Sequence, residues 1–390
     1  MSQVSVVKCN KYDKIMLKSS ITKALDMIGG ISSFMNKGNN VLLKVNLLSP
    51  KPPEAAVTTH PKFVEAVVEL FKEAGAAKVM VGDSSGGAIA GKAVTAKAFK
   101  VSGIQDAAER AGAEVVNFDK TGVVGIKVTN DEIIYLAKPV VEADVVVSLP
   151  KLKTHSATLF TGAVKNMFGC IPGLKKAEYH RKYPNPNKFA HILTQIYSIS
   201  RVQLSIMDGI TAMEGNGPGS GPPKDLGLIL ASADGVALDS VASKIIGYDP
   251  IKIPYLTECD RRGLGVAQLD KIQIKGWALE TVKARDFRLP SNAFLTRVPD
   301  FIGTGLLNIL KAVPAANPEK CNGCQVCVEN CPPQVIKMKG KIPDINYDEC
   351  IECLCCHELC PQNAMELKFR NPFIRIIAGL LSGAGGTIRH

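Results

Sequence analysis

The sequence contains few aromatic residues, no long apolar segment and no basic run. Phe, Trp and Tyr account for 6% of its 390 residues, and there is a single tryptophan. Because no stretch approaches 18 consecutive apolar residues, we expect no membrane-spanning helix. The lysines are spread along the chain with few aromatic side chains among them, so we expect no nucleic-acid partner. The first residues lack an apolar run behind a basic start, so we expect no signal peptide and a cytoplasmic protein.

Cysteine, by contrast, is concentrated near the end of the chain. Nine of the 12 cysteines lie between residues 321 and 361, and eight of these form two copies of the pattern C-x2-C-x2-C-x3-C-P, displaced by 29 residues. This spacing wraps three thiolates around an iron–sulfur cube, and a following turn exports the fourth. Paired C-x2-C runs also hold zinc, but eight cysteines in this order favour two 4Fe-4S clusters. The eight are Cys321, Cys324, Cys327 and Cys331, then Cys350, Cys353, Cys356 and Cys360.

The other cysteines fit no such pattern. Cys355 is adjacent to a candidate ligand, and it is an alternative ligand, an oxidation liability or, as we expect, a small buried residue. Cys170 is either a small buried hydrophobe or a redox thiol near a cluster. Twelve cysteines without a secretion signal favour thiolate ligands in a reducing compartment over disulfides.

Apolar runs alternate with helical patterns over roughly the first 290 residues. This alternation predicts an α/β domain with a mainly parallel sheet covered by helices on both faces. Thr59, His60 and Pro61 predict the start of a helix, and Ser19, Ser20 or Thr22 the start of an earlier one. We expect strands at residues 5–8, 41–47, 78–82, 114–118, 145–149, 204–207 and 228–231, and further helices at about 103–112 and 236–246, the last capped by Asp234.

Polar side chains gather where these predicted strands end. In parallel sheets, ligands bind beyond the carboxyl ends of the strands, so these side chains should line one pocket. Each residue alone is an ordinary loop residue, but several lysines and amides together suit a carboxylate, a phosphate or another anion. The binding candidates are Lys44, Asn46, Ser84, Lys151, Lys153, Lys165 and Asn166.

Three further side chains are candidates for moving protons. Asp83 and His155 follow predicted strands, and Glu214 lies beside the glycines of the segment at 213–223. That segment is a phosphate cradle, a mobile lid or a tight crossover. It is not a Walker loop, because no Gly-Lys-Ser/Thr follows it, and it lacks the strand–GxGxxG–helix context of a dinucleotide site.

Several of these motifs together resemble a known family. Residues of about 1–280 are similar to the family called domain of unknown function 362, and the resemblance supplies no established reaction. Such domains are commonly followed by a ferredoxin-like module, which implies an iron–sulfur protein with a redox role. The motifs are Lys44-Val-Asn46, Thr59-His60-Pro61, Gly82-Asp83-Ser84, Pro150-Lys151-Leu-Lys153-Thr154-His155, Lys165-Asn166-Met-Phe-Gly169 and Asp208-Gly209-Ile-Thr-Ala-Met-Glu214-Gly215.

The C-terminal part resembles bacterial two-cluster ferredoxins, with a hairpin around Lys339 and Gly340. The resemblance implies that the fourth cysteine of each run ligates the other cluster. Cluster one would take Cys321, Cys324, Cys327 and Cys360, and cluster two Cys350, Cys353, Cys356 and Cys331.

We therefore expect an α/β domain at 1–290, a connector at 291–316 with a broken helix or two short ones, and a small ferredoxin-like α+β module at 317–368. A tail at 369–390 contains an apolar stretch too short to span a bilayer. The first 300 residues carry 38 basic and 28 acidic side chains, a net charge of +10. This charge either helps the domain dock on an acidic cluster module or acts only through solubility.

The functional expectation is electron transfer through two clusters. An external carrier, for example a ferredoxin, would exchange electrons with an anionic substrate or cofactor held by the α/β domain. The alternative is a non-enzymatic binding or maturation protein whose clusters are structural or serve assembly. The sequence alone does not decide whether the protein is an enzyme.

Overall fold

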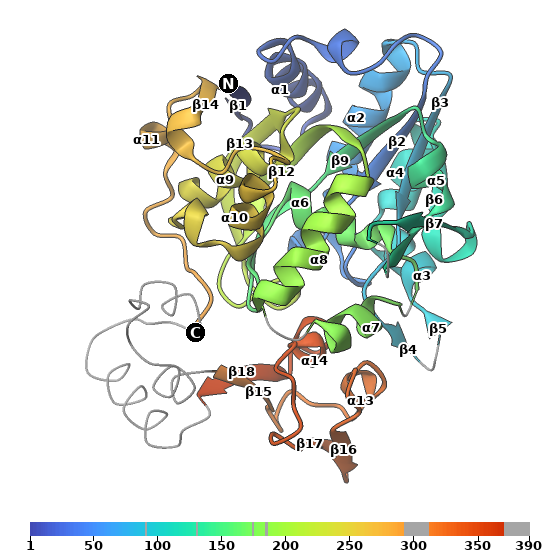
Figure 1. The fold of residues 1–390 in the computed structure, drawn as a ribbon, viewed down its shortest axis with the longest axis vertical. Helices are drawn as coiled ribbons and strands as arrows, with labels where there is room; N and C mark the ends of the chain where they lie inside the picture. The colour runs from blue at the N-terminus through green and yellow to red at the C-terminus, as the bar shows by residue number, and fades with distance from the viewer. Residues whose placement is uncertain (90–91, 130–131, 174, 184–185, 292–311, 370–390) are drawn as a thin grey trace.

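The computed structural model describes residues 1–89, 92–129, 132–173, 175–183, 186–291 and 312–369. Its centre is a ten-stranded sheet (Figure 1). The main order is β14 (Ile272–Gly276), β1 (Ser2–Lys8), β13 (Pro223–Ser232), β12 (Val202–Met213), β9 (Val145–Leu149), β2 (Asn40–Val45), β3 (Lys78–Asp83) and β6 (Glu114–Asn117). Pairing is parallel between β2 and β3, β2 and β9, β9 and β12, β3 and β6, and β1 and β14, whereas β13 runs antiparallel to β1 and β12.

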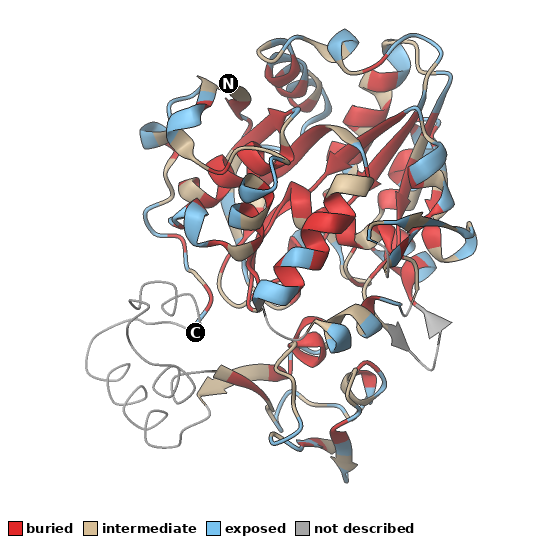
Figure 2. Cartoon of the chain, in the orientation of Figure 1, coloured by how far each residue is buried: buried red, intermediate tan, exposed pale blue. Residues whose placement is uncertain are grey.

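Helices cover both faces of this sheet, as the sequence predicted. Side chains alternate along a strand, so Val41 and Leu43 enter one core whereas Leu42 enters the other. The strands are buried along most of their length (Figure 2). The first face carries α1 (Lys14–Asp26), α2 (Pro61–Glu73), α3 (Thr95–Val101) and α4 (Ile104–Arg110), and the second carries α6 (Ala163–Asn166), α8 (Pro186–Ile199), α9 (Gly235–Ile245) and α10 (Pro254–Arg261).

The N-terminal caps of the helices were predicted correctly in two cases and wrongly in one. His60 caps α2 by accepting a hydrogen bond from the Lys62 N–H, and Asp234 caps α9, as predicted. The predicted start of α1 at Ser19, Ser20 or Thr22 is wrong. Asp13 accepts from the Met16 N–H and begins α1 earlier, because an aspartate there caps as well as serine or threonine does.

One segment predicted as a loop is a strand. Residues after Leu149 form β10 (Lys151–His155), which pairs with β12 in parallel and with β11 (Leu159–Thr161) in antiparallel orientation. An irregular register between Lys151 and Lys153 accompanies the first pairing. The polar sequence concealed this strand, whose five residues are all buried.

Smaller elements complete the large domain. A hairpin, β7 (Val123–Lys127) with β8 (Ile133–Ala137), lies outside the main sheet, as does the short pair β4 (Ala88–Ile89) and β5 (Lys92–Ala93). The remaining helices are α5 (Lys138–Glu142), α7 (Lys175–Lys182) and α11 (Leu279–Val282), with single 3-10 turns at Ile31–Ser33, Pro53–Ala55, Phe118–Lys120, Met167–Cys170, Pro250–Lys252 and Leu269–Lys271.

The C-terminal module is a small α+β unit at one end of the large domain (Figure 1). It contains the predicted hairpin as β16 (Ile336–Lys339) and β17 (Ile342–Ile345), with helices α13 (Val326–Glu329) and α14 (Cys355–Glu358). Strand β15 (Ala312–Ala316) pairs with β18 (Met365–Phe369). Residues 312–316 therefore belong to the sheet of the module rather than to the connector, and Phe369 belongs to it rather than to the tail.

Two of the predictions concern residues that the structure does not describe. The broken helix of the connector and the apolar stretch of the tail lie outside the described residues. Within the described ranges, no helix combines the length and the apolar character that crossing a membrane requires.

Candidate functional site

The eight patterned cysteines form two groups in space. One hollow of the module is lined by Cys321, Cys324, Cys327 and Cys360, and another by Cys331, Cys350, Cys353 and Cys356. Apolar side chains such as Val326, Met338 and Ile345 complete the walls. In each group three cysteines come from one run and the fourth from the other. Four thiolates in an apolar shell are the donor set that a 4Fe-4S cluster uses, so these residues fit that group.

The second cysteine group lies against the large domain. Helix α14 carries Cys355 and Cys356, and it lies near α7 of the large domain (Figure 1). Between the two parts is a cavity of about 110 Å³, lined from the module by Asn330, Cys355, Glu358 and Leu359. The large domain contributes the remaining walls, and they include most of the predicted binding residues. The cavity is therefore a site at the junction of the two parts.

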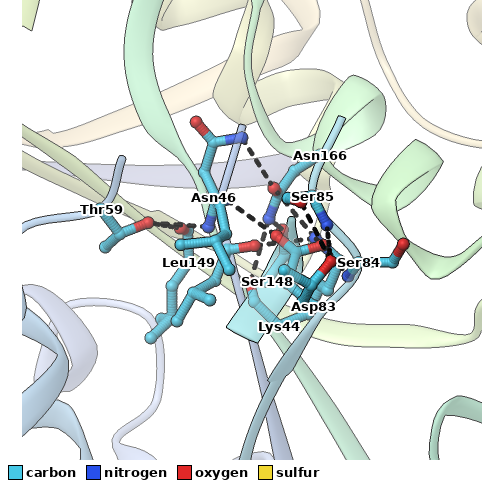
Figure 3. Close-up of polar contacts among 12 residues, drawn as sticks. Lys44, Asn46, Thr59, Asp83, Ser84, Ser85, Ser148, Leu149 and Asn166 are labelled. Carbon is cyan, nitrogen blue, oxygen red and sulfur yellow. Dashed lines mark hydrogen bonds and ion pairs between the residues drawn. The ribbon is translucent and has the colours of Figure 1, made fainter. Parts of the chain in front are cut away.

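Lys44 lines this cavity and is held by a buried polar network (Figure 3). Its Nζ lies 3.0 Å from Oδ1 of Asp83 and donates to the Val45 carbonyl and to Oδ1 of Asn166. The Asn166 Nδ2 in turn donates to the Lys44 carbonyl oxygen and to Oγ of Ser148, both at 3.0 Å. Burial raises the pKa of Asp83, and the Lys44 ammonium opposes this shift. The pair is thus internally neutralised.

Gly169 allows this network to form. A Cβ at this position would lie 2.3 Å from Oδ1 of Asp83 and 2.6 Å from Nζ of Lys44. The glycine in Lys165-Asn-Met-Phe-Gly169 therefore permits a close approach of the backbone to the ion pair.

Lys176 of α7 is also fully engaged. Its Nζ donates to the Ser84 carbonyl at 2.7 Å, to the Ser84 Oγ at 2.7 Å and to the Ser85 carbonyl at 3.0 Å. Burial lowers its pKa to about 8, against the attraction of Asp83 and Asp119. Ser84 donates to Asp119 at 2.6 Å, so it organises the wall and Lys176 around it.

Two other lysines of the cavity have donor capacity left. Lys153 is 1% exposed and donates to the Val57 carbonyl at 2.8 Å. Burial, followed by repulsion from Lys165, lowers the pKa of Lys153 to about 7. Lys165 forms no ion pair or hydrogen bond with the described residues, and its Nζ lies 5.7 Å and 5.9 Å from the ring centres of Phe168 and Phe189. An anion between Lys153 and Lys165 would relieve their mutual repulsion.

His155 meets Glu358 of the module across the cavity. The His155 Nδ1 accepts from the backbone N–H groups of Ala157 and Thr158, which places the proton of the neutral ring on Nε2. Nε2 lies 3.1 Å from Oε1 of Glu358, but neither atom has an aligned hydrogen-bond partner. Burial and nearby Lys165 and Lys153 hold the pKa of His155 well below its usual value. His155 is therefore a neutral N–H donor rather than an acid at neutral pH.

Asp239 positions the helix that carries Lys165 and Asn166. Its two carboxylate oxygens accept from the N–H groups of Ala163 (2.6 Å) and Val164 (3.0 Å), at the start of α6. Burial raises the pKa of Asp239 to about 8, and these hydrogen bonds oppose the rise. An aspartate of α9 thus fixes the direction in which α6 enters the cavity wall.

Two predicted site residues lie away from the cavity. Lys151 is paired with Asp208 at 2.8 Å and donates to the Tyr12 hydroxyl. Glu214 accepts from the backbone N–H and the guanidinium of Arg288. Neither side chain lines the cavity. Both carboxylate–cation pairs are structural links between distant segments, so the predictions for Lys151 and Glu214 are not supported by their positions.

The glycine-rich segment docks the module. The Asn216 carbonyl lies 3.1 Å from Nε2 of His357, and Ser220 donates to Asn363 at 3.1 Å. A Cβ at Gly219 would lie 2.4 Å from the Glu358 carbonyl oxygen, so the backbones of the two parts touch there. The segment connects the antiparallel strands β12 and β13 and forms an interface with the module.

Two cysteines whose roles the sequence left undecided have different surroundings. Cys170 is buried in the large hydrophobic core, and burial raises its pKa to about 12, so it stays a thiol. Cys355 is 6% exposed and lines the cavity. The sequence indicated that Cys355 is buried but missed its place in the cavity. It also missed Glu358, because no local pattern shows which segment of another domain a module residue meets.

Comparisons with known proteins agree with this organisation. The model of the family described as Domain of unknown function (DUF362) matches residues 41–244, and that of a 4Fe-4S dicluster domain matches residues 320–364. The chain is 35% identical over 302 residues to the Thylakoid-associated protein sll1697 of Synechocystis sp., a match that covers 74% of this chain and 92% of the relative.

Two solved structures are more distantly similar. One is a protein from Thermotoga maritima, with 13% identity, a TM-score of 0.37 and 59% of this chain covered. The other is the lactate racemase apoprotein from Thermoanaerobacterium thermosaccharolyticum, with 12% identity, a TM-score of 0.41 and 64% covered. The chain spans 57% of the length of each. By the family match and the 35% identical relative, the chain belongs to the DUF362 family and carries a 4Fe-4S-binding dicluster domain after it.

Proposed function

We propose that the protein is an iron–sulfur oxidoreductase of the reducing cytoplasm that holds two 4Fe-4S clusters. It exchanges electrons between an external carrier, such as a ferredoxin, and an anionic substrate or cofactor in the cavity between its two parts. The first cluster is ligated by Cys321, Cys324, Cys327 and Cys360, and the second by Cys350, Cys353, Cys356 and Cys331.

One observation carries this proposal. The same small cavity is lined by Lys153 and Lys165, two cations without an ion-pair partner among the described residues, and by Cys355, which lies between two ligands of the second cluster. A ligand held by the lysines is then adjacent to the cluster loop. Bound clusters would supply single electrons at this place.

The residues around the cavity have separate roles in this proposal. Lys165 and Lys153 bind the anion, and Lys44 and Lys176 shape the walls through their internal contacts. His155 orients the ligand through its Nε2–H. Lys153, with a pKa of about 7, is the side chain best matched to giving or taking a proton at neutral pH.

The test compares Lys153→Met and Lys165→Met with Lys100→Met in the anaerobically reconstituted protein. Lys100 is exposed at the end of α3, away from the cavity. Binding of sulfate, measured by calorimetry, should weaken at least tenfold in each cavity variant, because each removes a charge that faces the ligand directly. Iron content and the reduction of both clusters should be unchanged in all three variants.

Unchanged sulfate binding in both cavity variants would refute the cavity as the anion site. Clusters that resist reduction at every accessible potential would instead favour the alternative, a binding or maturation protein with structural clusters. Reversible one-electron reduction of each cluster separates the two functions.

A further inference from the structure

We infer that the anion in this cavity is a small organic acid that also carries a hydroxyl or amino group, such as a hydroxy acid. This inference rests on the proposed function and defines its ligand more closely. It follows from polar atoms of the cavity that have no partner in the described part of the protein.

Unpartnered polar atoms concentrate at this site. Eight buried side-chain nitrogen or oxygen atoms lack a hydrogen bond among the described residues, and four of these eight belong to residues that line the cavity. They are Asn46 Oδ1, His155 Nε2, Thr161 Oγ1 and Glu358 Oε1. His155 Nε2 and Glu358 Oε1 lie 3.1 Å apart, but they are not aligned for a hydrogen bond with each other. His155, Thr161 and Glu358 are each more than nine-tenths buried. Because an unsatisfied buried polar atom costs about 1–3 kcal/mol, their grouping points to a ligand that completes them.

The network around Asn166 fixes which atom Asn46 presents. Asn166 Nδ2 must face the Lys44 carbonyl, which can only accept, so its Oδ1 faces the opposite way. That Oδ1 accepts from Lys44 and, at 3.4 Å, from Nδ2 of Asn46. The Asn46 Oδ1 is therefore left over, and it points away from Asn166 (Figure 3). A carbonyl oxygen needs a hydrogen-bond donor, which a bare oxyanion cannot supply.

The cavity thus offers both donors and acceptors to a ligand. Lys153 and Lys165 donate to an oxyanion, whereas the Asn46 Oδ1 accepts from a donor group. His155 Nε2 and Glu358 Oε1 lie 3.1 Å apart, so a hydroxyl group beside them can accept from the first and donate to the second, and Thr161 can do either. A ligand that satisfies all of these atoms carries a charged oxygen group and a hydroxyl or amino group on one small skeleton.

The volume limits the size of the skeleton. The cavity measures about 110 Å³. A water molecule needs roughly 10–15 Å³ on the same measure, so there is room for an acid of a few carbon atoms. A nucleotide or a large cofactor would not fit inside.

The experiment uses two matched pairs of acids with the anaerobic holoprotein: succinate with malate, and acetate with glycolate. Members of each pair differ by one hydroxyl group. Calorimetry should show that the hydroxylated acid binds roughly three- to tenfold more tightly, which corresponds to one added hydrogen bond. In Asn46→Leu this preference should fall towards one, while succinate binding is retained. Asn36→Leu, at an exposed position, should keep the preference.

The outcomes separate this inference from the function on which it rests. If no acid and no sulfate binds to a protein with intact clusters, the proposed anion site fails as a whole. If succinate binds as tightly as malate, the site stands and the inference about the ligand is overturned, whether or not the Asn46 variant folds. If Asn46→Leu folds and keeps the wild-type preference, the assignment to Asn46 is overturned.

Discussion

Lys153 shows how one buried side chain acquires a titration in the physiological range. Burial is the largest cause of its lowered pKa, and Lys165 and Lys151 lower it further, whereas Glu358 and Asp83 raise it. A pKa of about 7 means that small changes in pH alter the charge that an anion meets. Its neighbour His155 is neutral over the same range and adds no titration of its own near pH 7.

We predict that sulfate binding weakens as the pH rises above 7. Lys153 attracts the anion only when it is protonated, whereas sulfate keeps its charge from pH 6 to 9. Affinity should be constant below about pH 7 and fall by up to tenfold per pH unit above it, until the pKa of the complex is reached. Calorimetry of the wild type from pH 6 to 9 measures this fall. Lys153→Met should bind weakly and lose the fall that begins near pH 7, keeping only the fall that Lys176, with a pKa of about 8, contributes at higher pH. A flat wild-type profile would contradict the prediction.

Individual residues also show what the sequence could predict. Eight predicted site residues line the cavity, because polar side chains after buried strands of a parallel sheet meet at one edge. Lys151 and Glu214 share this sequence position but are paired with Asp208 and Arg288. Partners so far along the chain leave no local signal. The sequence thus identified candidate polar residues at the strand ends. It did not show which of them were already paired with a charged residue of another segment.

At the level of elements, the cavity depends on a very short helix. Helix α6 has four residues, too few to be stable by itself, yet it carries both Lys165 and Asn166. Its first two free N–H groups are satisfied by Asp239 from α9. Seven strands of the main sheet were predicted from apolar runs, whereas β10 was missed because its buried residues are polar. No strand was predicted at β7, β8, β11 or β14 either. The sequence therefore predicts elements with a strong hydrophobic pattern better than elements that are held in place by tertiary contacts.

We predict that Asp239→Asn destabilises the protein by about 1 kcal/mol and weakens sulfate binding. Asparagine keeps one acceptor oxygen but turns an NH2 group towards the second N–H of α6. Thermal unfolding of the anaerobic holoprotein and calorimetry measure the two effects. Asp249→Asn is the matched control, since Asp249 is exposed and its side chain makes no capping hydrogen bond. Loss of stability with unaltered sulfate affinity would show that Asp239 does not position the binding residues.

For the whole molecule, the contact between the large domain and the cysteine-rich module determines where the cavity lies. The cysteine repeats could be read directly because cluster ligation demands fixed spacing. Their contact with the large domain could not, because it depends on close backbone approaches such as Gly219 against Glu358. The two cysteine groups also differ in exposure: Cys324 of the first is exposed, whereas Cys356 of the second is buried. A partner would therefore reach the first group more readily.

In the proposed two-cluster protein, an anion in the cavity should change the potential of the second cluster more than that of the first. Reduction adds an electron, so a negative ligand beside the second cysteine group should make that cluster harder to reduce and lower its midpoint potential. By linkage, reduction should weaken anion binding by the same factor. A tenfold effect corresponds to about 59 mV for a one-electron couple. Redox titrations followed by electron paramagnetic resonance, with and without saturating sulfate, would measure both clusters. Equal shifts of both, or none in the wild type, would contradict the prediction, and Lys165→Met should show a smaller shift at the same sulfate concentration.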